Sequence, residues 1–179
     1  MKMYFIALLA PENINAKVLQ WKYFFKEKFG CIVALKSPAH ITLVPPFWIK
    51  PESESELINS INEFSLNLKP FELKLKDFSS FNPKVIFVNV VANEFLDQLH
   101  QDFNDYIIAG NKFQIKKDER VFQPHITIAT RDLYKKAYYE SWEIFATKKY
   151  EAVWQVNGIS LLKHNSINWE VIYSSQFSG

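Results

Sequence analysis

The tetrapeptides His40-Ile41-Thr42-Leu43 and His125-Ile126-Thr127-Ile128 decide the fold, because the same His-x-Thr pattern occurs twice in the chain. Each copy lies in a short β-branched, apolar run bounded by proline or a turn signal, which is typical of a strand. Side chains alternate between the faces of a strand, so the histidine and threonine of each copy share one face. Such a polar pair on an otherwise buried strand needs a partner or a ligand. Two copies predict two strands that present matching pairs to a shared space.

Length and composition predict one domain with a packed interior. The 179 residues fit one domain, or two small lobes that share a core. A hydrophobic fraction of 48% and an aromatic fraction of 16% exclude a disordered chain. The formal net charge of +2 gives no general electrostatic case for tight duplex nucleic-acid binding, so an anionic ligand would need a local patch.

Cysteine content and the N-terminal run bear on location. The single cysteine, Cys31, cannot form an internal disulfide, which favours a reducing, cytoplasmic location. The apolar run from Met3 to Ala10 is interpreted as a first buried strand, with a signal peptide as the alternative. No stretch approaches the length of a membrane span, so we expect no membrane partner.

The remaining elements follow from apolar periodicity and turn signals. In the first half we expect a strand over 4–9, a helix over 12–29 ended by Gly30, a short strand over 31–35, the first motif strand closed by Pro45-Pro46, a helix over 53–68 and a strand over 71–78. In the second half we expect a strand over 85–91, a helix over 93–109, a short strand over 113–115, the second motif strand, a helix over 132–146, and strands over 150–156, 158–162 and 169–173.

The two halves show the same order of strand, helix, His-x-Thr strand and helix. We interpret the match as an internal duplication within a single domain of residues 1–179, with halves of roughly 1–83 and 84–179. The predicted fold class is α+β: two β-sheet lobes related by a pseudo-twofold axis, with helices on their outer faces, around a central cleft.

Two imidazoles across a cleft suit general acid–base catalysis, since histidine titrates near neutral pH. One of His40 and His125 can take a proton from the attacking water or hydroxyl while the other gives a proton to the leaving oxygen. The hydroxyls of Thr42 and Thr127 can donate hydrogen bonds to non-bridging oxygens, where negative charge grows in the transition state. A phosphodiester fits, because in-line displacement places the attacking and leaving groups on opposite sides of phosphorus.

Other classes of function stay open at this point. A metal-dependent hydrolase is disfavoured, because the motif strands carry no Asp, Glu or Cys beside the histidines and no helical His-x3-His pair occurs. We therefore expect no metal and no cofactor. A Cys-His nucleophile lacks support, since Cys31 lies in an apolar run that is interpreted as buried. A nucleotide-binding module without turnover, and a structural domain whose His-Thr pairs only satisfy each other, are the alternatives from other classes.

At the paired motifs the chain resembles the 2H phosphoesterases, and within them the branch of 2′-5′ RNA ligases and 2′,3′-cyclic phosphodiesterases. The run Phe122-Gln123-Pro124-His125 and the two ends of the chain, 4–9 and 161–173, add to the resemblance. It implies metal-free hydrolysis of a 2′,3′-cyclic phosphate at an RNA end or on a nucleotide, typically to a 2′-phosphate. Some members also join RNA through 2′-5′ linkages in the reverse direction.

The resemblance also implies roles for single residues. His40 would be the proton donor and His125 the base that activates water, although a near-symmetric cleft lets these roles exchange. Thr42 and Thr127 would hold the phosphate. The implied partner is an RNA terminus or a cyclic nucleotide, and we expect a monomer. Whether the substrate is tRNA, an oligonucleotide, a cyclic mononucleotide or an ADP-ribose cyclic phosphate stays open.

The chain departs from the family pattern after both motifs. Members often carry an arginine directly after the alanine of the second motif, where this chain has Ala129-Thr130-Arg131. By strand parity Arg131 shares the face of His125 if the strand continues, so we predict a phosphate or substrate contact, with a solvated arginine as the alternative. After the first motif, Val44-Pro45-Pro46 replaces the more usual aromatic-glycine turn, which leaves the substrate preference open.

For the remaining polar and aromatic residues we expect mainly core packing or exposure to solvent. For Phe47, Trp48 and Phe122, which flank the motifs, core packing is expected ahead of base stacking. His100 is expected to be a surface or partly buried helix residue, and His164 to lie in a solvated turn. Three cations are candidates for a local basic rim, with solvation as the default: Lys36, Lys84 and Arg120.

Overall fold

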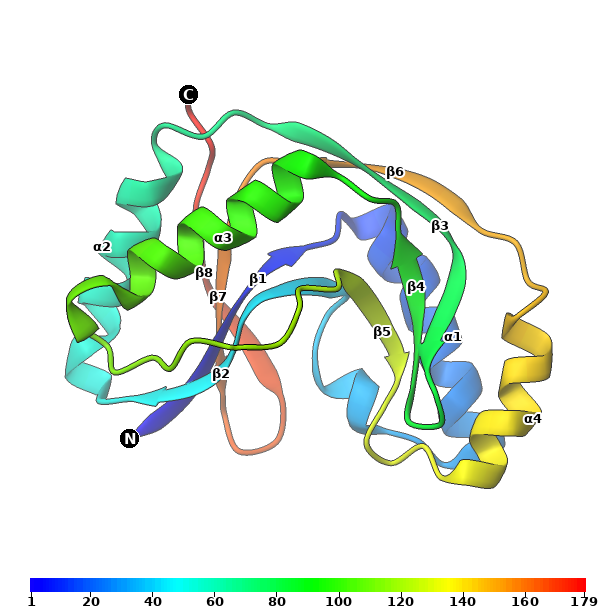
Figure 1. The fold of residues 1–179 in the computed structure, drawn as a ribbon. Helices are drawn as coiled ribbons and strands as arrows, with labels where there is room; N and C mark the ends of the chain where they lie inside the picture. Colours follow the sequence, from blue (N-terminus) through cyan, green and yellow to red (C-terminus); the bar gives the residue numbers. More distant parts are fainter.

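The computed structural model describes residues 1–179 and contains two four-stranded antiparallel sheets (Figure 1). Sheet A has the order β2-β1-β7-β8, with β1 Lys2–Leu9, β2 His40–Ile49, β7 Ser160–His164 and β8 Trp169–Ser174. Sheet B has the order β5-β4-β3-β6, with β3 Phe71–Phe81, β4 Val85–Val90, β5 His125–Ala129 and β6 Glu151–Val156.

Four α-helices cover the outer faces of the sheets, which confirms the predicted α+β class with two lobes (Figure 1). They are α1 Glu12–Phe29, α2 Glu54–Ser65, α3 Glu94–Ile108 and α4 Lys135–Phe145, with short 3-10 helices η1 Val33–Lys36, η2 Pro51–Ser53 and η3 Ala109–Asn111. We call sheet A with α2 and α3 lobe A, and sheet B with α1 and α4 lobe B. Gly30 ends α1 as predicted, because its φ of 73° lies in the left-handed region that glycine favours.

Each sheet takes strands from distant parts of the chain. The β1–β2 pair joins β7 and β8 in sheet A, while sheet B collects β3 to β6. Helix α1 leaves sheet A and packs against β5 of sheet B, whereas α3 leaves sheet B and packs against β2 of sheet A. The two lobes are therefore interleaved in sequence, although β1-α1-β2 and β4-α3-β5 take matching places. The duplication with a boundary near residue 83 stays a prediction.

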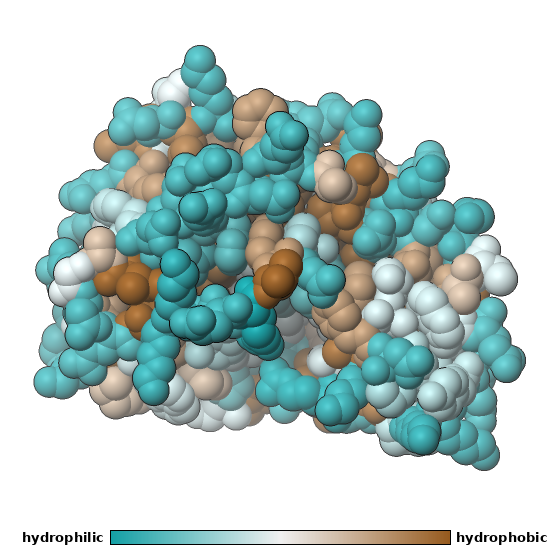
Figure 2. Space-filling model, viewed as in Figure 1, coloured by the Kyte–Doolittle hydropathy of each residue, from teal (hydrophilic) through white to brown (hydrophobic).

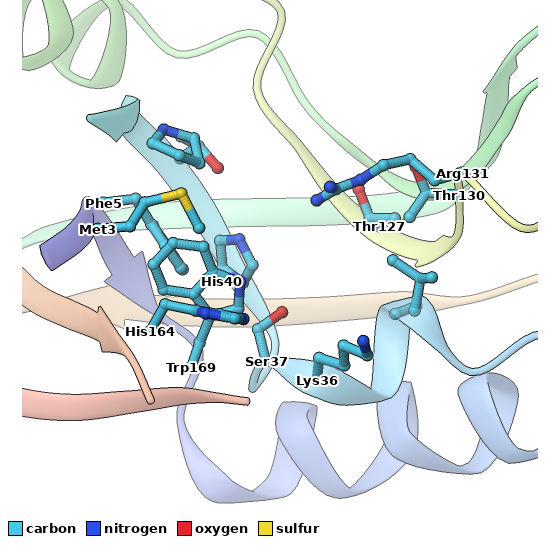
Figure 3. Close-up of a pocket in the computed structure, with 14 residues that line it drawn as sticks. Met3, Phe5, Lys36, Ser37, His40, Thr127, Thr130, Arg131, His164 and Trp169 are labelled. Atoms are coloured by element: carbon cyan, nitrogen blue, oxygen red, sulfur yellow. The ribbon is translucent and has the colours of Figure 1, made fainter. Parts of the chain in front are cut away.

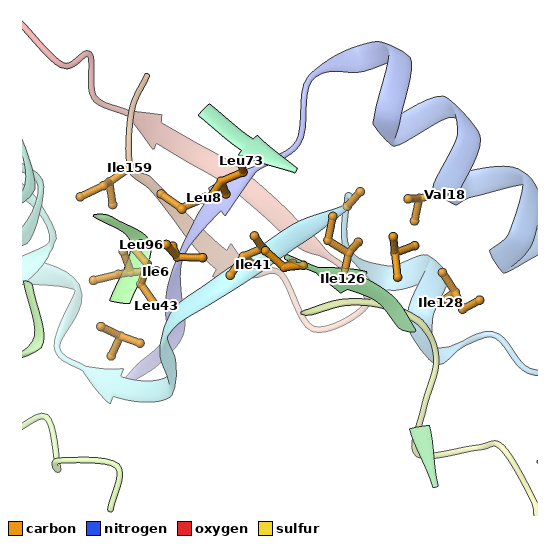
Figure 4. Close-up of a cluster of buried hydrophobic side chains, with 14 of the residues drawn as sticks. Ile6, Leu8, Val18, Ile41, Leu43, Leu73, Leu96, Ile126, Ile128 and Ile159 are labelled. Atoms are coloured by element: carbon orange, nitrogen blue, oxygen red, sulfur yellow. The ribbon is translucent and has the colours of Figure 1, made fainter. Parts of the chain in front are cut away.

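One hydrophobic core of 40 buried residues runs through both lobes (Figure 4). Ile41 and Ile126, which alternate with the polar residues of the motifs, are both 0% exposed and lie near the middle of this core. Their burial confirms the predicted alternation, since His40, Thr42, His125 and Thr127 are each only partly buried on the opposite strand face. The shared core fixes the two motif strands relative to each other.

Two predicted short strands are wrong. Residues 31–35 contain the start of η1, because Asp132 Oδ2 accepts the N–H groups of Ile32 and Val33 at 2.6 and 3.0 Å and so caps a helical turn. Residues 113–115 form a loop, and Gln114 has a φ of 53°, which a strand cannot hold.

Several predicted boundaries also differ, among them those of β2 and α4. Strand β2 does not stop at Pro45-Pro46 but continues to Ile49. The prolines are tolerated because β2 is an edge strand and its register against β1 shifts between Tyr4 and Ile6, where no ladder N–H is required of them. Helix α4 begins at Lys135 rather than near 132, since residues 130–133 form a turn closed by the N–H of Leu133 and the carbonyl of Thr130 at 2.7 Å.

Candidate functional site

The two motif strands lie side by side at the centre of the molecule. Strands β2 and β5 are the edge strands of their sheets that contact each other across the lobes (Figure 1). The surface is hollowed between the two lobes in the space-filling view (Figure 2). The structure therefore brings the four predicted motif residues to one region, between the lobes.

His40 and His125 are held in the same way. Nδ1 of His40 lies 2.7 Å from the carbonyl oxygen of Pro38, and Nδ1 of His125 lies 2.6 Å from that of Gln123. A carbonyl oxygen only accepts, so each Nδ1 carries the proton and donates it. In both imidazoles Nε2 is consequently the atom left to take or give a proton.

The surroundings of both imidazoles favour the neutral form. Burial lowers the pKa of His40 to about 4, against the opposing effect of its hydrogen bond to Pro38, and the positive charges of Lys22 and His125 lower it further. Burial also lowers the pKa of His125, again against its carbonyl hydrogen bond. The positive charge of His125 is one of the causes that lower the pKa of His40, so the two imidazoles lie within electrostatic reach, as acid–base catalysis on one ligand requires.

Two adjoining cavities form the cleft. The first has a volume of about 310 Å³ and holds His40, whereas the second has a volume of about 560 Å³ and holds His125. Thr42, Pro46 and Arg131 line both cavities, so the two open into each other at these side chains. Figure 3 shows the first cavity from within, with His40 on one side and Thr127 and Arg131 on the other.

The threonine hydroxyls are free to bind a ligand. Neither Thr42 nor Thr127 has a side-chain hydrogen bond to the protein, and neither hydroxyl belongs to the buried unpaired atoms, whose one member is Asp132 Oδ1. The side chains of His40 and His125 bond only to backbone carbonyls. The His-Thr pairs therefore do not satisfy each other, which contradicts the alternative of a purely structural role.

Arg131 lines the cleft, but it does not lie on an extension of the second motif strand as expected. Strand β5 ends at Ala129, so strand parity does not place Arg131. The turn of residues 130–133 instead directs it to the wall shared by both cavities, where Figure 3 shows its side chain extending toward His40. A guanidinium there can donate two hydrogen bonds to one phosphate.

Some of the other predicted residues line the cavities, and others lie in the core or at the surface. Lys36 lines the first cavity, whereas Arg120 lines the second and is engaged by Asp118, 2.6 Å from its Nη2. Phe47 is buried as expected, but Trp48 is 57% exposed, so its predicted core packing is wrong. Phe122 packs against the core, and its ring stacks on that of His100 at 3.7 Å between centroids, at the wall of the second cavity.

Sequence reasoning missed part of the first cavity. Its wall includes Met3, Phe5, His164 and Trp169 beside His40 (Figure 3). His164 was expected in a solvated turn, but the β7–β8 hairpin carries it to the cleft. The available signal was the alternation of β1, which puts Met3 and Phe5 on the face opposite the fully buried Tyr4 and Ile6.

The residues of the chain form no group of three or more His, Cys, Asp or Glu side chains that could hold a metal ion. Cys31 is a buried free thiol, and burial together with Asp132 raises its pKa to about 11. A thiol with so high a pKa is a poor nucleophile at neutral pH. No helix is both long and apolar enough to cross a membrane.

Comparisons with known proteins identify the family of this chain. The sequence profile of the 2′-5′ RNA ligase superfamily matches residues 10–168. A predicted phosphoesterase of Geobacillus kaustophilus is 30% identical over 132 residues, which cover 73% of this chain and 69% of the relative. The RNA 2′,3′-cyclic phosphodiesterase of Methanocaldococcus jannaschii is 28% identical over 125 residues, which cover 69% of this chain and 68% of that protein.

Solved structures show the same fold. TT0787 of Thermus thermophilus has a TM-score of 0.68 at 19% identity, with 100% of this chain and 99% of that chain covered. E. coli LigT complexed with 3′-AMP also has a TM-score of 0.68, at 17% identity, with 99% of each chain covered. With the profile match across most of the sequence, we conclude that the chain belongs to the 2′-5′ RNA ligase superfamily of 2H phosphoesterases.

Proposed function

We propose that this protein is a metal-independent 2′,3′-cyclic phosphodiesterase that acts on RNA ends or nucleotides, with 2′-5′ RNA ligation as the reverse reaction. One observation carries the proposal: two imidazoles with the same Nδ1–carbonyl bond leave their Nε2 atoms free beside two unpaired threonine hydroxyls. The name of the Methanocaldococcus jannaschii relative and the 3′-AMP complex of LigT support a nucleotide ligand.

The reaction assigns a proton movement to each histidine. Nε2 of one imidazole takes a proton from water, the water oxygen bonds to phosphorus, and the bond from phosphorus to the ribose O3′ breaks. Nε2 of the other imidazole gives its proton to O3′, which leaves a 2′-phosphate and a 3′-hydroxyl. By resemblance His40 is the donor and His125 the base. Thr42, Thr127 and Arg131 hold the non-bridging oxygens as charge grows on them.

The test is hydrolysis of 2′,3′-cyclic CMP in excess EDTA by the wild type, His40→Ala and His125→Ala. We expect wild-type turnover to persist in EDTA and each variant to lose about 10²- to 10⁴-fold in kcat, because each removes one proton-transfer group. Thermal unfolding of all three proteins checks that the variants fold. Loss of activity in EDTA, or full activity in either variant, would contradict the proposed mechanism.

An aryl ester separates the two histidine roles. The p-nitrophenolate leaving group of a nucleoside 3′-(p-nitrophenyl phosphate) needs no proton, so the variant that lacks the acid should recover activity on it. The variant that lacks the base should not recover. We expect recovery in His40→Ala; recovery in His125→Ala would reverse the assignment while leaving the two-histidine mechanism in place.

The threonine roles are tested by Thr42→Val and Thr127→Val. Valine keeps the branched shape on the half-buried strand face but removes the hydroxyl, so we expect stability within about 1 kcal/mol and a loss of about 10²-fold in kcat. A matched control is Ile41→Val on the buried face of β2, which should cost about 1 kcal/mol of stability and little activity.

The alternative is a nucleotide- or RNA-end-binding module without turnover. It would bind a cyclic nucleotide in the same cleft with no product formed by the wild type, which isothermal titration together with product analysis distinguishes from catalysis. A monomeric state and a cytoplasmic location stay predictions, to be checked by sedimentation and by cell fractionation.

A further inference from the structure

We propose that the tip of the β7–β8 hairpin forms a nucleoside subsite, in which the base packs against Trp169 and accepts a hydrogen bond from Nε2 of His164. The subsite rests on the proposed function, because it gives the nucleoside of the cyclic phosphate its place in the cleft. Both residues line the first cavity beside His40 (Figure 3).

Aromatic side chains form one continuous wall of this cavity. Trp169 contacts the rings of Phe5 and His164 edge to face, at centroid distances of 4.6 and 4.9 Å. Phe5 in turn contacts the ring of His40 at 4.8 Å. A planar base placed on this wall would stay within reach of His40, so the phosphate and the base of one nucleotide can be held together.

The hydrogen bonding of His164 differs from that of the other two cleft histidines. The backbone N–H of Ser166 donates to Nδ1 of His164 at 3.3 Å, so Nδ1 is the acceptor and the neutral ring carries its proton on Nε2. Nε2 makes no hydrogen bond within the protein. His164 therefore presents a donor to the cavity, where His40 presents a group that can accept or release a proton.

The hairpin is built to hold this donor in place. Ser166 has a φ of 84°, a left-handed conformation that a non-glycine residue adopts only when its surroundings fix it. The side chain of Asn165 accepts the N–H groups of Ile167 and Asn168 at 3.0 and 2.8 Å and donates to Glu170 at 2.6 Å. His164 and Trp169 are also paired directly across the two strands.

The charge and volume of the first cavity are compatible with a nucleotide. None of its 14 lining residues is acidic, and two of them, Lys36 and Arg131, are cations that can hold a phosphate. Its volume of about 310 Å³ matches the lower end of small-molecule sites.

The experiment compares two substrates that differ only in the base: 2′,3′-cyclic AMP and methyl β-D-riboside 2′,3′-cyclic phosphate. We expect wild-type kcat/KM to be about 10- to 100-fold higher for the nucleotide, the effect of one stacked and hydrogen-bonded base. Trp169→Ala and His164→Leu should bring this ratio close to 1, mainly through a higher KM for the nucleotide. His164→Gln should keep most of the ratio, because its amide nitrogen also donates.

A control variant and a second measurement distinguish failure of the subsite from failure of the proposed function. Val171→Ala, on the exposed part of β8 outside both cavities, should leave the ratio unchanged. A ratio that Trp169→Ala and His164→Leu do not alter would overturn the subsite. If the wild type hydrolyses neither substrate, the proposed function fails, and titration with 3′-AMP against inorganic phosphate then tests the subsite alone. Weaker 3′-AMP binding by both variants, with equal phosphate binding, would support it; equal 3′-AMP binding would overturn it.

Discussion

Nζ of Lys22 donates a hydrogen bond to the carbonyl of Ser37 at 2.8 Å, three residues before His40, and this lysine is only 3% exposed. No carboxylate pairs with it. One helical face of α1 also carries Asn15, whose side chain accepts the N–H of Ala39 at 2.8 Å. Between these two anchors lies Pro38, whose carbonyl receives Nδ1 of His40. We therefore infer that Lys22 is a positioning residue for His40.

Replacement of this lysine, Lys22→Met, should remove a pH dependence of stability. Burial lowers the pKa of Lys22 to about 8, from 10.5. Between these pH values the unfolded chain holds a proton that the folded chain has released, so the free energy of unfolding rises with pH, by about 3 kcal/mol at most. Urea unfolding from about pH 7 to 10.5 measures it. A difference between wild type and Lys22→Met that stays constant with pH would contradict the prediction.

The pH profile of catalysis should favour the acidic side of neutrality. The pKa of His40 is lowered to about 4 and that of His125 is also lowered, so the free protein holds both imidazoles neutral at pH 7. Catalysis needs one of them protonated, so kcat/KM, which reports the free protein, should already be lower at neutral pH than in mild acid and should fall further as pH rises. The kcat maximum should lie at higher pH, because a bound anionic phosphate raises both pKa values.

The same substitution provides a check on this profile. The charge of Lys22 contributes to the lowered pKa of His40, so Lys22→Met should move the acid limb of kcat/KM to higher pH. A merely structural role of the lysine would lower the rate at every pH without moving that limb. A kcat/KM profile that is flat from about pH 5 to 9 would contradict the two-histidine assignment.

Local patterns were sufficient to predict the motif strands and their polar face. The alternation of Ile41 with His40 and Thr42 depends only on the period of two in a strand and on one buried face, and the structure confirms it. Gly30 ends α1 as predicted, because the left-handed conformation of glycine at a helix end is also a local preference. The cleft residues in these segments were therefore accessible from sequence.

Features that depend on long-range pairing could not be predicted from the sequence. The segment 31–35 was expected to be a strand, and it becomes a helical turn because Asp132, one hundred residues away, accepts its N–H groups. His164 was assigned to a solvated turn, because its place in the cleft depends on the pairing of β7 with β1. Strand pairing across such distances leaves no periodic signal in a single sequence.

The two arginines of the chain should differ in their effect on substrate binding. Arg131 lines both cavities and has no carboxylate partner, whereas Arg120 is bound to Asp118 through Nε and Nη2. Arg131→Gln should raise KM for 2′,3′-cyclic CMP by about 10- to 100-fold, the worth of charge-assisted hydrogen bonds to phosphate. Arg120→Gln, measured beside it, should raise KM much less. Equal effects of the two substitutions would contradict the assignment of Arg131.

Asp132 should couple stability to substrate binding, because it ties the two sides of the cleft together. Its Oδ2 accepts the N–H groups at the start of η1, the turn that carries Lys36 into the first cavity, while Asp132 itself directly follows Arg131. Asp132→Ala removes the charged acceptor of these two N–H groups, so we expect a loss of about 1–3 kcal/mol in the free energy of unfolding. It should also raise KM, since Lys36 and Arg131 both lose a fixed position.

Two variants separate this coupling from simple destabilisation. Asp132→Asn keeps a side-chain oxygen as acceptor, so it should recover most of the stability and of the KM. Asp77→Ala removes a similar carboxylate, which accepts the N–H of Tyr150 at 3.0 Å away from both cavities, and should lower stability without changing KM. Urea unfolding and steady-state kinetics on 2′,3′-cyclic CMP measure both quantities. If Asp132→Ala loses stability while its KM stays at the wild-type value, then η1 does not position the cleft, and Lys36 has no part in binding the phosphate.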